Sequence, residues 1–169
     1  MPDGFSLSEV VKLTGAKRRS IQLWADGGIL FAAADTDRLG TGVHRRFSLQ
    51  EVQIAALLTP LVNIGAPIGV LKRFSGILRQ GFYRTEIGST SAHTEPLPKE
   101  FPKALDRACA GVGANYLLFF WTKDSFHMDI KTDEQGPVAI DPAEVVGAGR
   151  FNEVLGILDL TALLLPLGK

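Results

Sequence analysis

The first helix of this chain is encoded in the stretch Phe5-Ser6-Leu7-Ser8-Glu9-Val10-Val11-Lys12-Leu13-Thr14-Gly15. Ser6 can accept a hydrogen bond from the third free amide of the helix, while the Glu9 carboxylate reaches back to the amide of Ser6. Gly15 suits the left-handed conformation in which helices commonly end. These signals predict a helix over residues 7–13 that begins at a capping box and stops before the glycine.

The same helix-opening pattern returns at Ser48-Leu49-Gln50-Glu51. It predicts a second capping box, in which Glu51 again reaches back to the amide of Ser48. The helix that follows is expected over residues 49–62, and a fourth helix over residues 68–80 follows after a glycine and a proline. The third helix should present a broad apolar inner face, made by Val52, Ala55, Ala56, Leu58 and Val62.

A basic helix and a basic turn lie between these two patterns. Residues 17–25 are expected to be helical, because Ile21 and Trp24 give them one apolar face and a Gly-Gly pair follows. Trp24 is therefore interpreted as a core residue. Residues 31–43, in which Asp, Thr and Gly recur, predict a loop or a short hairpin.

Seven polar side chains of this region are candidates for contact with DNA. An α-helix fits the major groove, where residues near its N-terminus meet base edges or flanking phosphates. Arginine can pair with guanine through two hydrogen bonds, and glutamine can pair with adenine. The alternative is a solvated basic face, with Phe47 beside it as a core residue. The candidates are Lys17, Arg18, Arg19 and Gln22 on the helix and His44, Arg45 and Arg46 in the turn.

Three segments resemble the MerR-type winged helix-turn-helix regulators, in the order in which that family has them. Residues 5–15 look like the first helix and turn of the family. The segments Ile21-Gln22-Leu23-Trp24 and Gly28-Ile29-Leu30 are similar to its recognition helix and exit. Gly42-Val43-His44-Arg45-Arg46-Phe47-Ser48 is similar to its wing and to the cap of the next helix. The resemblance covers about residues 5–80 and implies a DNA-binding winged helix-turn-helix.

The resemblance also implies roles for single residues. Arg45 matches the wing arginine of the family, which implies contact with a DNA phosphate. Two positions depart from the family pattern: Gln22 stands where arginine is common, and Phe31 opens a run with three alanines where proline and arginine are usual. Metal sensing in this family uses pairs of thiolates, and Cys109 is the one cysteine of the chain. No metal site is expected, and Cys109 is interpreted as a buried structural residue.

The zero net charge of the 169 residues conceals a difference between the two halves. Residues 1–84 hold 11 Lys and Arg against 6 Asp and Glu, giving +5, and residues 85–169 hold 7 against 12, giving −5. This favours a polyanion-binding first half and a different partner for the second, unless it reflects uneven surface solvation alone. We expect a DNA-binding domain over residues 1–84, a linker over 85–98 and an α+β dimerisation or effector domain over 99–169.

The second half has the patterns of a small α+β domain. A helix is expected over residues 103–110. Residues 116–121 form a continuous apolar run that predicts a central strand, and residues 126–130 alternate as a half-buried strand does. The remaining patterns predict, in order, a strand over 138–140, a helix that opens at Asp141-Pro142-Ala143-Glu144, and an apolar strand with a short helix over 154–165.

Several classes of protein are excluded by what the sequence lacks. No run approaches the roughly 18 apolar residues of a membrane helix, and no signal peptide precedes the first capping box. A single cysteine cannot form an internal disulfide and suits a reducing cytoplasm. No arrangement of nucleophile and base indicates catalysis. We therefore expect a cytoplasmic protein that is not an enzyme and uses no cofactor.

The expected function is sequence-specific binding of double-stranded DNA by a bacterial transcriptional regulator. The sequence also allows an excisionase or phage-packaging type of DNA-binding protein, or a small-molecule sensor domain tethered to DNA. A homodimer is expected, and a small-molecule effector is compatible with it but is not identified. The family commonly dimerises through a long helix, which Pro96, Pro98 and Pro102 oppose here. Strands of the second half would then form the dimer contact, or else fill the core of a monomer.

Overall fold

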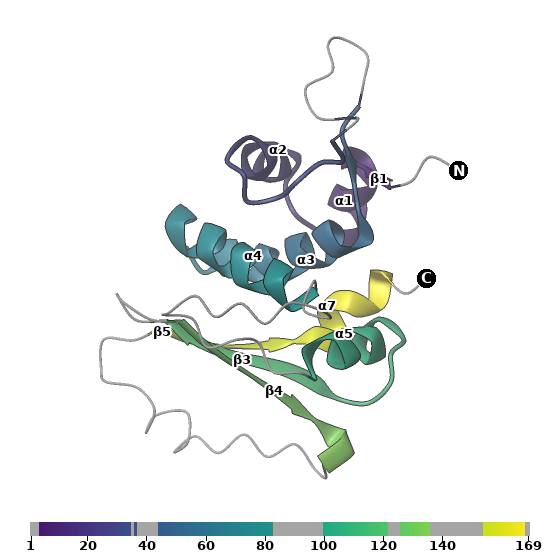
Figure 1. Cartoon of the computed structure of the whole chain (residues 1–169), viewed down its shortest axis with the longest axis vertical. Helices are drawn as coiled ribbons and strands as arrows, with labels where there is room; N and C mark the ends of the chain where they lie inside the picture. Colours follow the sequence, from purple (N-terminus) through teal and green to yellow (C-terminus); the bar gives the residue numbers. More distant parts are fainter. Residues whose placement is uncertain are drawn as a thin grey trace. The chain divides into compact units, whose positions relative to one another are not determined.

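The chain has an α+β fold, with helices packed beside one two-stranded and one three-stranded sheet (Figure 1). The computed structural model describes residues 4–34, 36, 44–82, 100–121, 126–135 and 154–167. The chain divides into two compact units, Met1–Arg79 and Gln80–Lys169. The predicted linker over 85–98, the strand over 138–140 and the helix from Asp141 lie outside the described residues.

The first unit contains the first three predicted helices, the fourth up to Arg79, and two short strands. Each helix lies within two residues of its predicted bounds, and the first ends at Gly15, whose φ of 68° is the expected left-handed conformation. The elements are β1 (Phe5–Ser6), α1 (Leu7–Thr14), α2 (Arg18–Asp26), β2 (Arg46–Phe47), α3 (Leu49–Asn63) and α4 (Ile68–Phe82).

The predicted capping box of α1 is confirmed. The amide and the hydroxyl of Ser6 each donate a hydrogen bond of 2.7 Å to Glu9 Oε2, and the amide of Glu9 donates one of 3.4 Å to Ser6 Oγ. Because the side chain and the backbone of Ser6 both donate to the ionised carboxylate, the pKa of Glu9 lies below its ordinary value. The nearby Arg46 guanidinium contributes in the same direction.

The second capping box is only half formed, so the predicted return of Glu51 to the Ser48 amide is wrong. Ser48 Oγ accepts a hydrogen bond of 3.3 Å from the Glu51 amide, as expected. The Glu51 carboxylate instead accepts bonds of 2.7 and 2.9 Å from Nε and Nη2 of Arg79, and one of 2.9 Å from the Phe31 amide. Two charge-assisted bonds from a guanidinium are stronger than one from a backbone amide.

This ion pair joins three segments of the first unit. Glu51 lies in the first turn of α3, Arg79 lies near the end of α4, and the exit of α2 is held by both of them. Arg79 Nη2 also donates to the carbonyl of Ile29 at 2.9 Å, and its guanidinium stacks 4.1 Å from the centre of the Phe31 ring. The two charged side chains are only 6% and 14% exposed, so the pair belongs to the core.

The hydrophobic core of the first unit contains the predicted aromatic residues. Trp24 and Phe47 are 3% and 1% exposed, which confirms both as core residues. The third helix was predicted to be buried on one face, but every residue from Glu51 to Leu58 is buried. This part of the helix is therefore buried on all sides. Val62, predicted to be on that face, is half-buried.

The second unit is built on an antiparallel sheet with the strand order β4-β3-β5. The predicted central strand is confirmed as β3, in which Leu117 is opposite Ile130 of β4 and Leu158 of β5. The elements are α5 (Phe101–Cys109), β3 (Asn115–Trp121), β4 (Phe126–Thr132), the 3-10 turn η1 (Asp133–Gln135), β5 (Val154–Asp159), α7 (Leu160–Leu164) and the 3-10 turn η2 (Leu165–Leu167).

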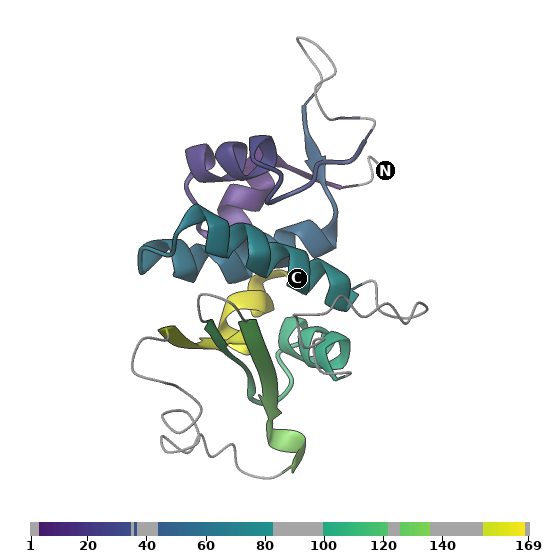
Figure 2. The same ribbon diagram turned by 60° about the vertical axis from the view of Figure 1, so that its left-hand side comes forward.

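The two faces of this sheet differ in burial. Helices α5 and α7 lie on one side of it, where Leu117 and Phe119 are buried (Figure 2). On the other face Leu118 is half-buried and Ile157 is 43% exposed. The alternation that predicted the strands is therefore realised as one core-facing side and one more accessible side, on which Leu118 and Ile157 lie beside the exposed Asp129. Cys109, expected to be buried, is half-buried.

A polar cluster connects α5 with the end of β4. Arg107 forms ion pairs of 2.7 Å with Asp133 and 2.9 Å with Glu134, and its Nε donates to the fully buried Asn115. Gly113 lies against this cluster with a φ of 68°, and a Cβ at that position would collide with Arg107 and Asp133. Asp133 and Glu134, which follow β4 directly, therefore hold α5 to the sheet.

We expect the first unit to be strongly destabilised when one partner of the buried Glu51–Arg79 pair is removed. Glu51→Ala should lower the free energy of unfolding by about 3–5 kcal/mol, because it leaves the Arg79 charge buried without its carboxylate. The measurement is urea unfolding of the full chain in a Trp121→Phe background, in which Trp24 is the single tryptophan and reports on this unit.

Glu9→Ala is the matched control, since it removes the corresponding glutamate of the exposed capping box. It should cost only about 1 kcal/mol, the usual value of a helix cap. Equal losses for the two variants would show that the buried pair contributes no more than a surface cap.

Candidate nucleic-acid interface

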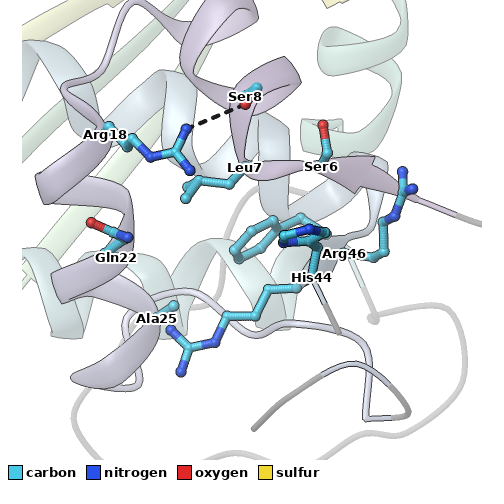
Figure 3. A pocket seen from close by; sticks show the side chains of 10 residues that line it. Ser6, Leu7, Ser8, Arg18, Gln22, Ala25, His44 and Arg46 are labelled. Atoms are coloured by element: carbon cyan, nitrogen blue, oxygen red, sulfur yellow. Dashed lines mark hydrogen bonds between the residues drawn. The ribbon is translucent and has the colours of Figure 1, made fainter. Parts of the chain in front are cut away.

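The start of α1, one face of α2 and the segment leading into β2 surround a hollow of about 430 Å³ (Figure 3). Three elements that are separate in the sequence therefore contribute to one concave surface of the first unit. The hollow is lined by Ser6, Leu7, Ser8, Arg18, Gln22, Ala25, His44, Arg45, Arg46 and Phe47.

Helix α2 contributes a polar face to the hollow. Arg18, Gln22 and Ala25 follow one another at helical spacing, while Ile21 and Trp24 between them are buried. Arg18 Nη1 donates a hydrogen bond of 3.3 Å to Ser8 Oγ, which connects α2 with the start of α1 (Figure 3). Because the apolar face anchors α2 in the core, its polar face is presented at the surface in a fixed orientation.

The segment from His44 to Phe47 is held by pairing on both of its edges. Phe47 is opposite Phe5 of β1, and it also forms an isolated bridge with Ala32. The Ala33 amide donates to the Arg46 carbonyl at 2.8 Å, so the base of the hairpin that was predicted over 31–43 is formed. Residue 35 and residues 37–43 of this segment, predicted as a loop or a short hairpin, lie outside the described residues.

The two arginines of this segment are oriented by contacts with different elements. Arg46 Nη1 donates to the Gly4 carbonyl at 3.3 Å and lies 3.9 Å from Glu9 Oε2. Arg45 Nη2 lies 2.8 Å from Asp26 Oδ1, at the last residue of α2. The basic segment is thereby connected to the first turn of α1 through Glu9 and to the last residue of α2 through Asp26.

The charges of α2 oppose the dipole of the helix. Basic residues Arg18 and Arg19 occupy its first turn, its last residue is Asp26, and no side chain caps its start at Lys17. Helices are stabilised by the opposite arrangement, by about 0.3–1 kcal/mol for each exposed charge. The positive charges at the start of α2 therefore weaken the helix itself and favour an external anion beside it.

The structure brings five of the seven predicted DNA-contact residues together at this hollow. Lys17 and Arg19 are exposed but do not line it, and Lys17 lines a second hollow of about 360 Å³ between the α1–α2 turn and the end of α3. The residues that the sequence did not indicate are Ser6, Leu7, Ser8 and Ala25, together with Asp26 beside the hollow.

The polar groups that line the hollow are guanidinium, amide, imidazole and hydroxyl groups. Within the part of the chain that the structure describes, no three His, Cys, Asp or Glu side chains are grouped so that they could hold a metal ion. In the same part, no helix has the length and apolar character needed to cross a membrane. Guanidinium groups on a concave surface can bind anionic oxygens through paired hydrogen bonds.

No family model matches this chain, and no curated protein matches its sequence. The interpretation of the hollow therefore rests on its own residues and on their geometry. Its three guanidinium groups can bind anionic oxygens, and its glutamine and histidine side chains can form hydrogen bonds with other polar groups of the same ligand.

Proposed function

We propose that the chain is a sequence-specific DNA-binding transcriptional regulator, in which the first unit acts as a winged helix-turn-helix of MerR type. The observation that carries the proposal is the convergence of α2 and the hairpin base on one hollow, which brings Arg18 and Gln22 beside His44, Arg45 and Arg46. A recognition helix with a basic strand beside it is an arrangement that can follow a groove and its phosphates together.

Each part of the interface has its own role in this proposal. Arg18 and Gln22 of α2 enter the major groove and meet base edges, because both side chains can form two hydrogen bonds with a purine. Arg45 and Arg46 contact the phosphates beside the groove. The +5 charge of residues 1–84 attracts DNA to this half of the chain, and the protein acts in the cytoplasm without catalysis.

The direct test is selection of genomic DNA fragments by the full-length chain. The wild-type protein should retain fragments that share a recurring sequence. The double variant Arg18→Ala/Arg45→Ala should lose this retention, because it removes one contact to bases and one to phosphate. The matched control Lys103→Ala/Lys131→Ala removes two cations of the second unit and should retain the same fragments. Failure of the wild-type protein to retain DNA at low salt would refute the proposal.

The two arginines should differ in the kind of binding that they support. Arg45→Ala should weaken binding to all sequences alike and make the logarithmic salt dependence shallower by about 0.9, the value for one lost phosphate contact. Arg18→Ala should cost about 1–3 kcal/mol on the selected sequence and less on random DNA. Titrations of labelled duplexes at several salt concentrations measure both effects.

Equal losses on the selected and the random duplex would assign Arg18 to phosphate contact and exclude it from base recognition. If Arg45→Ala instead weakens binding more on the selected duplex than on the random one, Arg45 would be assigned to base recognition. In either case the pattern of the losses, rather than their size, identifies the group of the DNA that each arginine contacts.

We further propose that the chain acts as a homodimer joined through the second unit. The accessible face of the sheet supports this, because Ile157 is 43% exposed there beside the half-buried Leu118. A second copy that covers this face would bury both side chains and place two interfaces on inverted half-sites.

Sedimentation of the full chain at micromolar concentration should give a dimer, and Ile157→Lys should convert it to a monomer. Ile68→Lys is the matched control, because Ile68 is also an exposed isoleucine but lies in the first unit. A monomeric wild-type chain, or an equal effect of the two substitutions, would contradict the dimer.

A further inference from the structure

Among the described residues, the ion pair between Arg45 and Asp26 is the closest contact of a cation of the hollow with a carboxylate. Its two atoms are 2.8 Å apart, whereas Arg46 lies 3.9 Å from Glu9 and Arg18 donates to the neutral hydroxyl of Ser8. The Glu9 oxygen near Arg46 already accepts two hydrogen bonds from Ser6. The carboxylate of Asp26 thus forms a closer ion pair with a cation of the interface than the carboxylate of Glu9 does.

The position of Asp26 is unfavourable for the helix that carries it. Asp26 is the last residue of α2, where the negative end of the helix dipole repels a carboxylate, and no basic residue lies in that last turn. The Asp26 side chain is 57% exposed and that of Arg45 is 24% exposed. A half-exposed ion pair contributes little to folding. Neither the stability of the helix nor the stability of the unit accounts for the acid at this position.

We propose that Asp26 is an intramolecular competitor for the DNA phosphate that Arg45 would bind, an inference that rests on the proposed function. A carboxylate and a phosphate offer the same kind of anionic oxygen to a guanidinium. DNA binding at this position is then an exchange, in which a phosphate oxygen replaces Asp26 and the released carboxylate returns to water. The exposure of Asp26 makes that return possible without rearrangement of α2.

This exchange lowers the affinity of the interface for every DNA sequence. Phosphate contacts supply essentially all of the binding to random DNA. An internal carboxylate that must be displaced makes one such contact weaker, and its negative charge near the DNA adds repulsion. Stable occupancy then depends more strongly on the base contacts of Arg18 and Gln22. Asp26 thereby reduces the time that the protein spends on sequences that α2 does not recognise.

The test compares Asp26→Asn with the wild-type full chain on a random duplex of about three helical turns. Asp26→Asn should bind this duplex about three- to tenfold more tightly, because the phosphate no longer competes with a carboxylate. Asp106→Asn is the matched control: it removes the same charge from an exposed aspartate in α5 of the second unit. The control should change the dissociation constant less than twofold.

A double-mutant cycle with Arg45→Ala identifies the group through which Asp26 acts. The gain from Asp26→Asn should shrink when Arg45 is absent, to the smaller part that comes from relief of the charge repulsion. Weaker binding by Asp26→Asn would overturn the proposal and make Asp26 a residue that positions Arg45 for the phosphate. An equal gain with and without Arg45 would overturn it as well. Absence of DNA binding by the wild-type chain would instead refute the proposed function itself.

Discussion

The buried ion pair of Glu51 and Arg79 is the constraint on which the first unit depends. Taking a carboxylate and a guanidinium out of water is costly, and the cost is offset only when further hydrogen bonds satisfy both groups. Here those bonds come from the backbone of the α2 exit, at the Phe31 amide and the Ile29 carbonyl. Folding α3 against α4 therefore also fixes where α2 ends and where the hairpin begins, so one interaction sets the geometry of the interface.

The local signals of the sequence were sufficient for the described α-helices and for the strands of the three-stranded sheet, but insufficient for this pair. The motifs Ser6–Glu9 and Ser48–Glu51 are equivalent as local patterns, and both hydroxyls cap their helices. The two glutamates differ because Arg79 lies near Glu51, 28 positions away in the sequence, and no such cation is aligned with Glu9 as closely. Helix capping depends on residues within one turn, which the sequence shows directly. The hydrogen-bond partner of a glutamate depends on tertiary packing, which the spacing of residues along the sequence does not reveal.

The candidate interface, like the helix caps, was predictable from the sequence only in part. The candidate residues of α2 and of the turn were evident from their chemistry and spacing, and five of the seven line one hollow. The contributions of Ser8 and Asp26 were not evident. Ser8 participates because α2 packs across the start of α1, and Asp26 because the hairpin base lies beside the end of α2. Both follow from tertiary contacts between elements whose individual sequences gave no indication of them.

The hairpin has a further consequence for how such a module can diverge. Its base is fixed by pairing of Phe47 with both Phe5 and Ala32, and by the bond from Ala33 to Arg46. Insertions or deletions between Thr36 and His44 would leave all of these contacts in place. Evolution can therefore change the length of that connection without any compensating change in the hydrophobic core.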